Sequence, residues 1–260
     1  MKLLIVLGLC LAATTGCASY TTPGGAANLH DFGASPKTQA QQGDAWITSE
    51  MNRKPLASFP ASVAVARVQA PGYTSYSAPT TWGSGAFTVV TSRDVETPQE
   101  MQRLEKMPQL RGIAPLNHLV IPPRLQSDED LRQAAAKLRA DILLVYTLDT
   151  CFEEKDRSTP LSVITLGATP TAQMHVACTA SAALLDTRSG YIYGLSETTE
   201  RRDAPRNAWT TEMEIDRFRV ATEQAAFNKL VGEIQRTWSG IVREHATAAA
   251  DPRRYETEGQ

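Results

Sequence analysis

The chain has 260 residues, a hydrophobic fraction of 42% and a formal net charge of −2 at pH 7. This length and apolar content fit one sizeable globular domain with a tail, and the lack of a basic surplus argues against a nucleic-acid-binding protein. The four histidines and four cysteines show no spacing typical of a zinc site. The sequence also lacks a Gly-x-Ser-x-Gly elbow and a phosphate-binding loop. We therefore predict no catalytic, cofactor-binding or metal-binding residue.

The N-terminus has the pattern of a bacterial secretion signal. Lys2 precedes the apolar run LLIVLGLCLAA, which is too short to span a membrane. The sequence Thr14-Thr15-Gly16-Cys17 that follows resembles the lipobox of bacterial lipoproteins, with Thr14 in place of the usual leucine. The resemblance implies that residues 1–16 are a removed signal peptide and that Cys17 carries lipid, including palmitate. The alternative is a plain signal peptide that leaves Cys17 as an ordinary thiol.

The residues after the lipobox predict where the protein lies and how it is divided. By resemblance to lipoprotein sorting signals, Ala18-Ser19 implies anchoring in the outer membrane, facing the periplasm. Residues 17–45 are small and polar, so we expect a lipidated flexible tether. We expect one α/β periplasmic domain over residues 46–246 and a frayed tail over residues 247–260.

The first half of the domain alternates predicted strands and helices. Strands are expected at 62–69, 86–91, 118–121 and 141–151, and helices at 98–107 and 128–139. Thr97 with Glu100 and Ser127 with Asp130 form capping-box patterns at the two helix starts. The last two strands and the helix between them predict a βαβ unit with parallel strands. The strand at 86–91, the first helix and the strand at 118–121 repeat this pattern.

The second half of the domain predicts a different architecture. Strands at 175–185 and 191–199 flank the turn signal Asp186-Thr187-Arg188-Ser189-Gly190, which indicates an antiparallel hairpin. An apolar stripe over 212–242 predicts a long C-terminal helix. The predicted fold class is thus α/β, with a mixed central sheet containing βαβ units, a C-terminal antiparallel hairpin and a long C-terminal helix.

Cys151 and Cys178 are the only cysteines left after signal removal and lipidation. Cys151 ends one predicted strand and Cys178 lies within the next long one. If these strands are antiparallel neighbours in an oxidising compartment, the pair is placed to form a disulfide. The alternative is two buried free thiols.

Two groups of residues suggest surfaces. Tyr73, Tyr76 and Trp82 occupy a predicted loop and form either an exposed partner-binding surface or a cover over the core edge. Asp149 and the nearby carboxylates would suit acid–base chemistry on peptidoglycan, although an exposed charged loop is the usual role of such a cluster. The nearby carboxylates are Glu153, Glu154 and Asp156.

The mature domain resembles the periplasmic domain of curli-secretion (CsgG-type) lipoproteins and of lipoprotein activators of penicillin-binding proteins. The matching segments are DLRQAAAKLRA, ADILLVYTLDT, ASAALLDTRSG, YIYGLSETTE and the terminal helix. The resemblance implies an α/β sandwich with a non-catalytic role in envelope assembly, and we expect an envelope protein partner. We therefore expect an outer-membrane lipoprotein that binds or assembles envelope proteins. The alternatives are a subunit of a secretion assembly, with homo-oligomerisation left open, and a peptidoglycan-acting enzyme.

Overall fold

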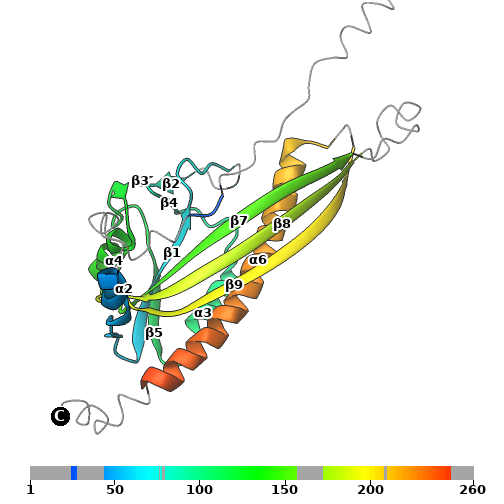
Figure 1. The fold of residues 1–260 in the computed structure, drawn as a ribbon. Helices are drawn as coiled ribbons and strands as arrows, with labels where there is room; N and C mark the ends of the chain where they lie inside the picture. The colour runs from blue at the N-terminus through cyan, green and yellow to red at the C-terminus, as the bar shows by residue number, and fades with distance from the viewer. Residues whose placement is uncertain are drawn as a thin grey trace, which may run out of the picture.

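The computed structural model describes residues 25–27, 44–75, 77, 80–156, 172–207 and 210–246. Its centre is a seven-stranded sheet in the order β2-β4-β1-β7-β8-β9, with β5 paired to the same edge of β1 as β4 (Figure 1). The strands are β1 (Ala61–Gln69), β2 (Thr81–Trp82), β4 (Thr88–Val90), β5 (Leu110–Pro115), β7 (Ile142–Asp156), β8 (Ala172–Asp186) and β9 (Ile192–Arg206). A separate pair joins β3 (Ser84–Gly85) to β6 (Arg124–Leu125). The mixed α/β fold class predicted from the sequence is confirmed.

Helices cover both faces of the sheet and divide its core in two. They are α2 (Asp44–Met51), α3 (Pro98–Glu105), α4 (Asp128–Lys137) and α6 (Glu212–Ile241), the last continued by a short π-helical segment, Val242–Ala246. Phe227 and Trp238 of α6 pack against one face, together with Leu104 of α3. Leu131 and Ala134 of α4 pack against the other face. No helix within the described ranges is long and apolar enough to cross a membrane.

The predicted helix starts are correct. In each capping pattern the acidic side chain accepts a hydrogen bond from the backbone N–H of the residue that caps the helix. The Glu100 carboxylate accepts from the Thr97 N–H at 3.0 Å, and Asp130 accepts from the Ser127 N–H at 3.2 Å. These contacts satisfy amides that have no partner within the helix. The start of α6 uses the same device, since Glu214 accepts from the Thr211 N–H at 2.8 Å.

The strand predicted at 118–121 is wrong. Asn117 starts a turn there: its side chain accepts from the Leu119 N–H, and its carbonyl accepts from the Val120 N–H. Leu119 is 80% exposed, so the short apolar run does not form a buried strand. The strand lies earlier, at β5, whose Gly112 and Pro115 conceal it in the sequence. A proline is tolerated in β5 because, among the described strands, β5 pairs only with β1 and so needs backbone hydrogen bonds on one side alone.

The parallel units also differ from the predicted arrangement. β5 and β7 both run parallel to β1 but lie on its two sides, so the connection through α4 passes from one neighbour of β1 to the other. β4 is antiparallel to β1, so strand 86–91 does not begin a second βαβ unit. The unit is instead β1, α3 and β5. The order of strands in a sheet depends on which strand lies between which neighbours. The alternation of apolar residues along a single strand does not specify this order.

The predicted C-terminal hairpin is correct and longer than expected. β8 pairs antiparallel with both β7 and β9, and all three strands have 15 residues. The turn between β8 and β9 is organised by Asp186, which is fully buried. Its carboxylate accepts from the backbone N–H groups of Leu56, Arg188 and Ser189 at 2.6–3.0 Å, and from the Tyr193 hydroxyl at 2.9 Å. This one side chain therefore fixes the turn and ties Leu56 to it, and Ser189 adds a hydrogen bond to the Lys54 carbonyl.

Candidate functional site

The strands β7, β8 and β9 bury one face against α6, while their other face is buried with α4 near the β8–β9 turn and is partly exposed farther along the strands. Along β8, buried and partly exposed residues alternate strictly from 173 to 181, as expected for a strand covered on one side. The buried series, which includes Cys178 and Ala180, packs against α6. The opposite series carries Thr179 and Ser181. We call this side of the three strands, which points away from α6, the open face.

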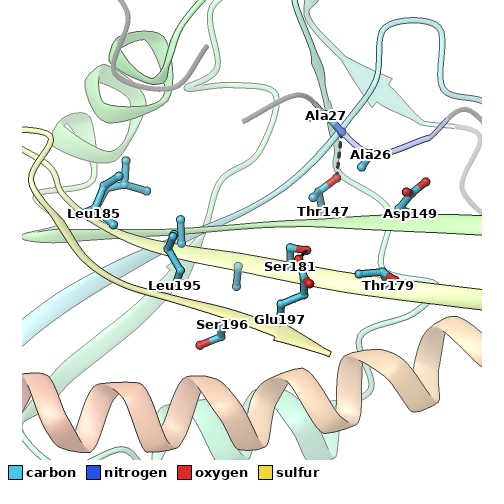
Figure 2. A pocket seen from close by; sticks show the side chains of 13 residues that line it. Ala26, Ala27, Thr147, Asp149, Thr179, Ser181, Leu185, Leu195, Ser196 and Glu197 are labelled. Atoms are coloured by element: carbon cyan, nitrogen blue, oxygen red, sulfur yellow. Dashed lines mark hydrogen bonds between the residues drawn. The ribbon is translucent and has the colours of Figure 1, made fainter. Parts of the chain in front are cut away.

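A pocket of about 600 Å³ lies on the open face, toward the end of the strands nearest the β8–β9 turn (Figure 2). Strand register explains how its residues meet. Thr147 of β7 is opposite Ser181 of β8, which is opposite Glu197 of β9. Asp149 lies two residues further along β7, opposite Thr179. Because side chains of paired residues share a face, these hydroxyl and carboxylate groups gather on one surface.

The segment 25–27 forms one wall of the pocket. Ala26 forms an isolated β-bridge with Gln69, and the Ala27 N–H donates to Thr147 Oγ1 at 3.0 Å (Figure 2). Thr147 Oγ1 in turn donates to Gln69 Oε1 at 2.9 Å. Gln69 also holds both backbone groups of Leu148, so the wall is fixed to β1 and β7. Three residues of the predicted tether thus contact the sheet.

The pocket combines an apolar floor with an acidic rim. Leu185 and Ala183 lie on the floor, while Ile192 and Leu195 of β9 are 47% and 68% exposed. Asp149 and Glu197 are the charged residues among the thirteen that line the pocket, and none of these is Lys, Arg or His. The Ser181 hydroxyl donates to Glu197 at 2.9 Å. Exposed aliphatic side chains that line a concavity often mark an interaction site.

Neither the cysteine pair nor a metal centre appears in the described part of the chain. Cys151 is opposite Ala177, whereas Cys178 is opposite Thr150, so the two thiols lie on opposite faces of the sheet. Both cysteines are free, which corrects the predicted disulfide: the strands are antiparallel neighbours, but the register is offset by one residue. Burial raises the pKa of the Cys178 thiol to about 12, so it is not a reactive thiolate. Among the described residues, no group of three or more His, Cys, Asp or Glu side chains is arranged to hold a metal.

The predicted aromatic surface is not formed as one patch. Tyr73 is buried, and its hydroxyl accepts a hydrogen bond from Arg67 at 3.0 Å. Tyr73 therefore covers the edge of the core and does not form an exposed binding surface. Trp82 is 39% exposed, and its indole N–H donates to the Ile121 carbonyl. Tyr76 lies outside the described residues, as does Cys17.

The predicted acidic group is only partly brought together. Asp149 lines the pocket, and Glu153 follows on the same face, opposite His175. The side chains of Glu154 and Asp156 lie outside the described part. The carboxylate that joins Asp149 at the pocket is Glu197, from a strand almost fifty residues later. Sequence reasoning missed Glu197, Ile192 and Leu195 because alternation reveals two faces of β9 but not which face α6 covers.

A buried charged network lies on the α6 side of the sheet. Arg219 is fully buried and bonds to Asp216 at 3.0 Å and Glu223 at 2.5 Å. Arg67 bonds to Asp94 at 2.7 Å. Burial alone would lower the pKa of both guanidinium groups, but the neighbouring Tyr73 and the carboxylates outweigh this effect and raise the pKa of both. Buried charges are tolerated when they are paired in this way.

The network also extends to strand β7 and to the loop before β2. Tyr146 donates its hydroxyl to Glu96, and Thr150 donates to Glu223 at 2.7 Å. Burial raises the pKa of Tyr146, and the nearby Glu96 adds to the effect. Arg219 also donates to Ser75 and Ser77. Because its members bond mainly to one another, we interpret the network as a structural connection that holds β1, β7, the loop before β2 and α6 together.

Comparison with known proteins gives only distant structural likenesses. No protein-family model and no curated protein sequence matches the chain. Lipoprotein GNA1162 from Neisseria meningitidis is 12% identical over 66% of this chain and 99% of its own, with a TM-score of 0.27. The PelC dodecamer protein from Paraburkholderia phytofirmans is 11% identical over 69% of this chain and 93% of its own, with a TM-score of 0.25. At these identities and TM-scores the likeness carries no argument about function.

Proposed function

We propose that the protein is a lipoprotein anchored in the outer membrane through Cys17, and that its periplasmic domain binds an envelope protein without catalysing a reaction. The observation that carries the proposal is the pocket on the open face, with its exposed aliphatic residues Ile192 and Leu195. A single exposed aliphatic side chain is ordinary on a protein surface. Two of them in one concavity, beside polar groups, fit a protein-docking site.

The position of the pocket supports an envelope partner. Cys17 and Gly25 are eight positions apart, so the chain between them spans at most about 30 Å. Gly25 is fixed to the sheet because its carbonyl accepts from the Ala70 N–H at 3.0 Å. A lipid on Cys17 would therefore keep the pocket wall within that distance of the membrane surface, where membrane-bound and periplasmic partners are both accessible.

Replacing Cys17 with serine is expected to remove the lipid and release the protein from the membrane fraction, because acyl chains supply the anchor. Labelled palmitate incorporation and membrane fractionation measure both effects. Cys151→Ser is the matched control, since Cys151 lies on the exposed sheet face, and it should retain label and membrane association. Equal palmitate label in wild type and Cys17→Ser would contradict the anchor.

Replacing Leu195 with arginine is expected to reduce partner recovery at least tenfold, because a charge in the centre of a docking surface removes apolar contact. The measurement is crosslinking in intact envelopes followed by affinity purification and quantitative mass spectrometry. Leu119→Arg is the control, because Leu119 is also an exposed leucine but lies outside the pocket. Equal recovery with both variants, or no specific protein with wild type, would contradict the proposal.

A second candidate function, a peptidoglycan-acting enzyme, is favoured by one observation. Asp149 and Glu197 line the same pocket from β7 and β9, and paired carboxylates are the usual groups of glycoside hydrolysis. If the protein only binds a partner, the wild type and the double variant Asp149→Asn with Glu197→Gln should release equal amounts of soluble fragments from purified peptidoglycan. Release by wild type that disappears in the double variant would favour the enzyme.

A further inference from the structure

We propose that the pocket receives an extended segment of the partner protein that carries an apolar and a basic side chain two positions apart. This inference rests on the proposed binding function and specifies the chemistry of the partner. It follows from the spacing of two features on β9 and from the charge of the pocket rim.

The spacing is set by the strand. Leu195 and Glu197 are two residues apart on β9 and both point to the open face, since they are opposite Ala183 and Ser181 of β8. Residues at this separation in a strand place their side chains roughly 7 Å apart. An extended peptide has the same repeat. A peptide lying along β9 can therefore place an apolar residue on Leu195 and a basic residue beside Glu197 at once.

The charge of the rim selects the second residue. Asp149 and Glu197 stand on the two strands that flank β8, about 10 Å apart across the sheet and offset by two residues, roughly 7 Å, along it. Both are exposed, and no basic residue lines the pocket. Between them lie the hydroxyl groups of Thr179 and Ser181, which accept hydrogen bonds as well as donate them. A lysine or arginine on the partner meets acceptors from three strands, whereas an acidic residue meets two carboxylates.

The apolar part selects the first residue. Ile192 and Leu195 offer aliphatic surface at one end of the pocket, and Leu185 and Ala183 complete the floor beneath them. The volume of about 600 Å³ is within the range of sites that enclose several side chains or a small ligand. It accommodates an aliphatic side chain together with the stem of a neighbouring basic residue.

The test uses the lipidated protein in nanodiscs of phosphatidylcholine and two fluorescent nine-residue peptides. In the first, Leu and Lys alternate at every second position with Thr between them; in the second, Glu replaces Lys. Fluorescence anisotropy measures the affinity of each. Wild type is expected to bind the lysine peptide at least tenfold more tightly than the glutamate peptide.

Two variants locate the preference. The double variant Asp149→Lys with Glu197→Lys is expected to lose the lysine preference or reverse it, and Glu105→Lys, an exposed site on α3, should retain it. Equal affinity for the two peptides, no binding of either at millimolar concentration, or an unchanged preference in the double variant would overturn the inference. Any of these results together with the loss of partner in Leu195→Arg would leave the proposed binding function standing. If Leu195→Arg retains the partner, the proposed function itself fails.

Discussion

Replacing Arg219 with alanine is expected to lower the free energy of unfolding by roughly 3–5 kcal/mol, because it removes a buried positive charge that is paired with buried carboxylates. Arg219 has no exposed surface and bonds to Asp216, Glu223 and two serines. Urea unfolding at pH 7, followed through the fluorescence of the buried Trp238, measures the change. The variant removes one buried positive charge from beside Asp216 and Glu223, while the longer contact of Glu223 with Arg67 at 3.9 Å remains.

A surface arginine on the same helix provides the control. Arg236 forms an ion pair with Glu233, but its side chain is 74% exposed, so Arg236→Ala should cost about 0–1 kcal/mol. Adding Glu223→Gln to Arg219→Ala should recover part of the lost stability, since it removes one of the buried negative charges that Arg219 had neutralised. If Arg219→Ala costs no more than Arg236→Ala, the network does not fasten α6 to the sheet.

Replacing Asp186 with asparagine is expected to destabilise the protein by about 2–3 kcal/mol at pH 7, because hydrogen bonds to a charged acceptor are stronger than those to a neutral one. Burial alone would raise the pKa of Asp186. The hydrogen bonds from the backbone of Ser189 and Leu56, the Tyr193 hydroxyl and the Arg188 backbone outweigh that effect and hold the pKa below its usual range. The measurement is the difference in urea midpoint between wild type and Asp186→Asn from pH 7 to pH 2.

The sign of the pH dependence follows from this lowered pKa. The folded state binds the proton less tightly than the unfolded state, so the stabilisation by Asp186 is complete above the unfolded pKa of about 3.9 and disappears as pH falls through the folded pKa. The gap between wild type and Asp186→Asn should therefore be constant near neutrality and shrink below about pH 4. Asp203→Asn, at an exposed site, should change stability by about 0.5 kcal/mol or less. A gap that widens on acidification would contradict the assignment.

The sequence indicates the structural role of Asp186 more clearly than that of Arg219. Asp186 opens the turn motif Asp-Thr-Arg-Ser-Gly, which predicted the hairpin correctly, although not that the turn holds segment 53–57. Gly190 fits this turn because its φ of 72° is in the region that favours glycine. Arg219 has no comparable signal. A basic residue in a long helix usually faces solvent. The buried position of Arg219 is explained by its partners Asp216 and Glu223 on the same helix and by two serines of the loop before β2.

The sequence by itself determined the local elements of this protein. Capping residues, apolar periodicity and the turn motif depend on neighbours within a few positions, which is why α3, α4, α6 and the β8–β9 hairpin were predicted correctly. It also provided the lipobox-like motif at Cys17, which remains a prediction. The strand at 118–121 failed because three apolar residues in a row do not distinguish a strand from a turn, and one of them, Leu119, is exposed.

Only the tertiary structure decided strand order, register and which sheet face remains open. A shift of one residue in register moves a side chain to the other face, and this separates Cys151 from Cys178. The same long-range pairing brings Asp149 and Glu197 to one pocket and leaves Leu195 uncovered. The candidate site is assembled from three strands and the segment 25–27, so no local pattern in the sequence contains it.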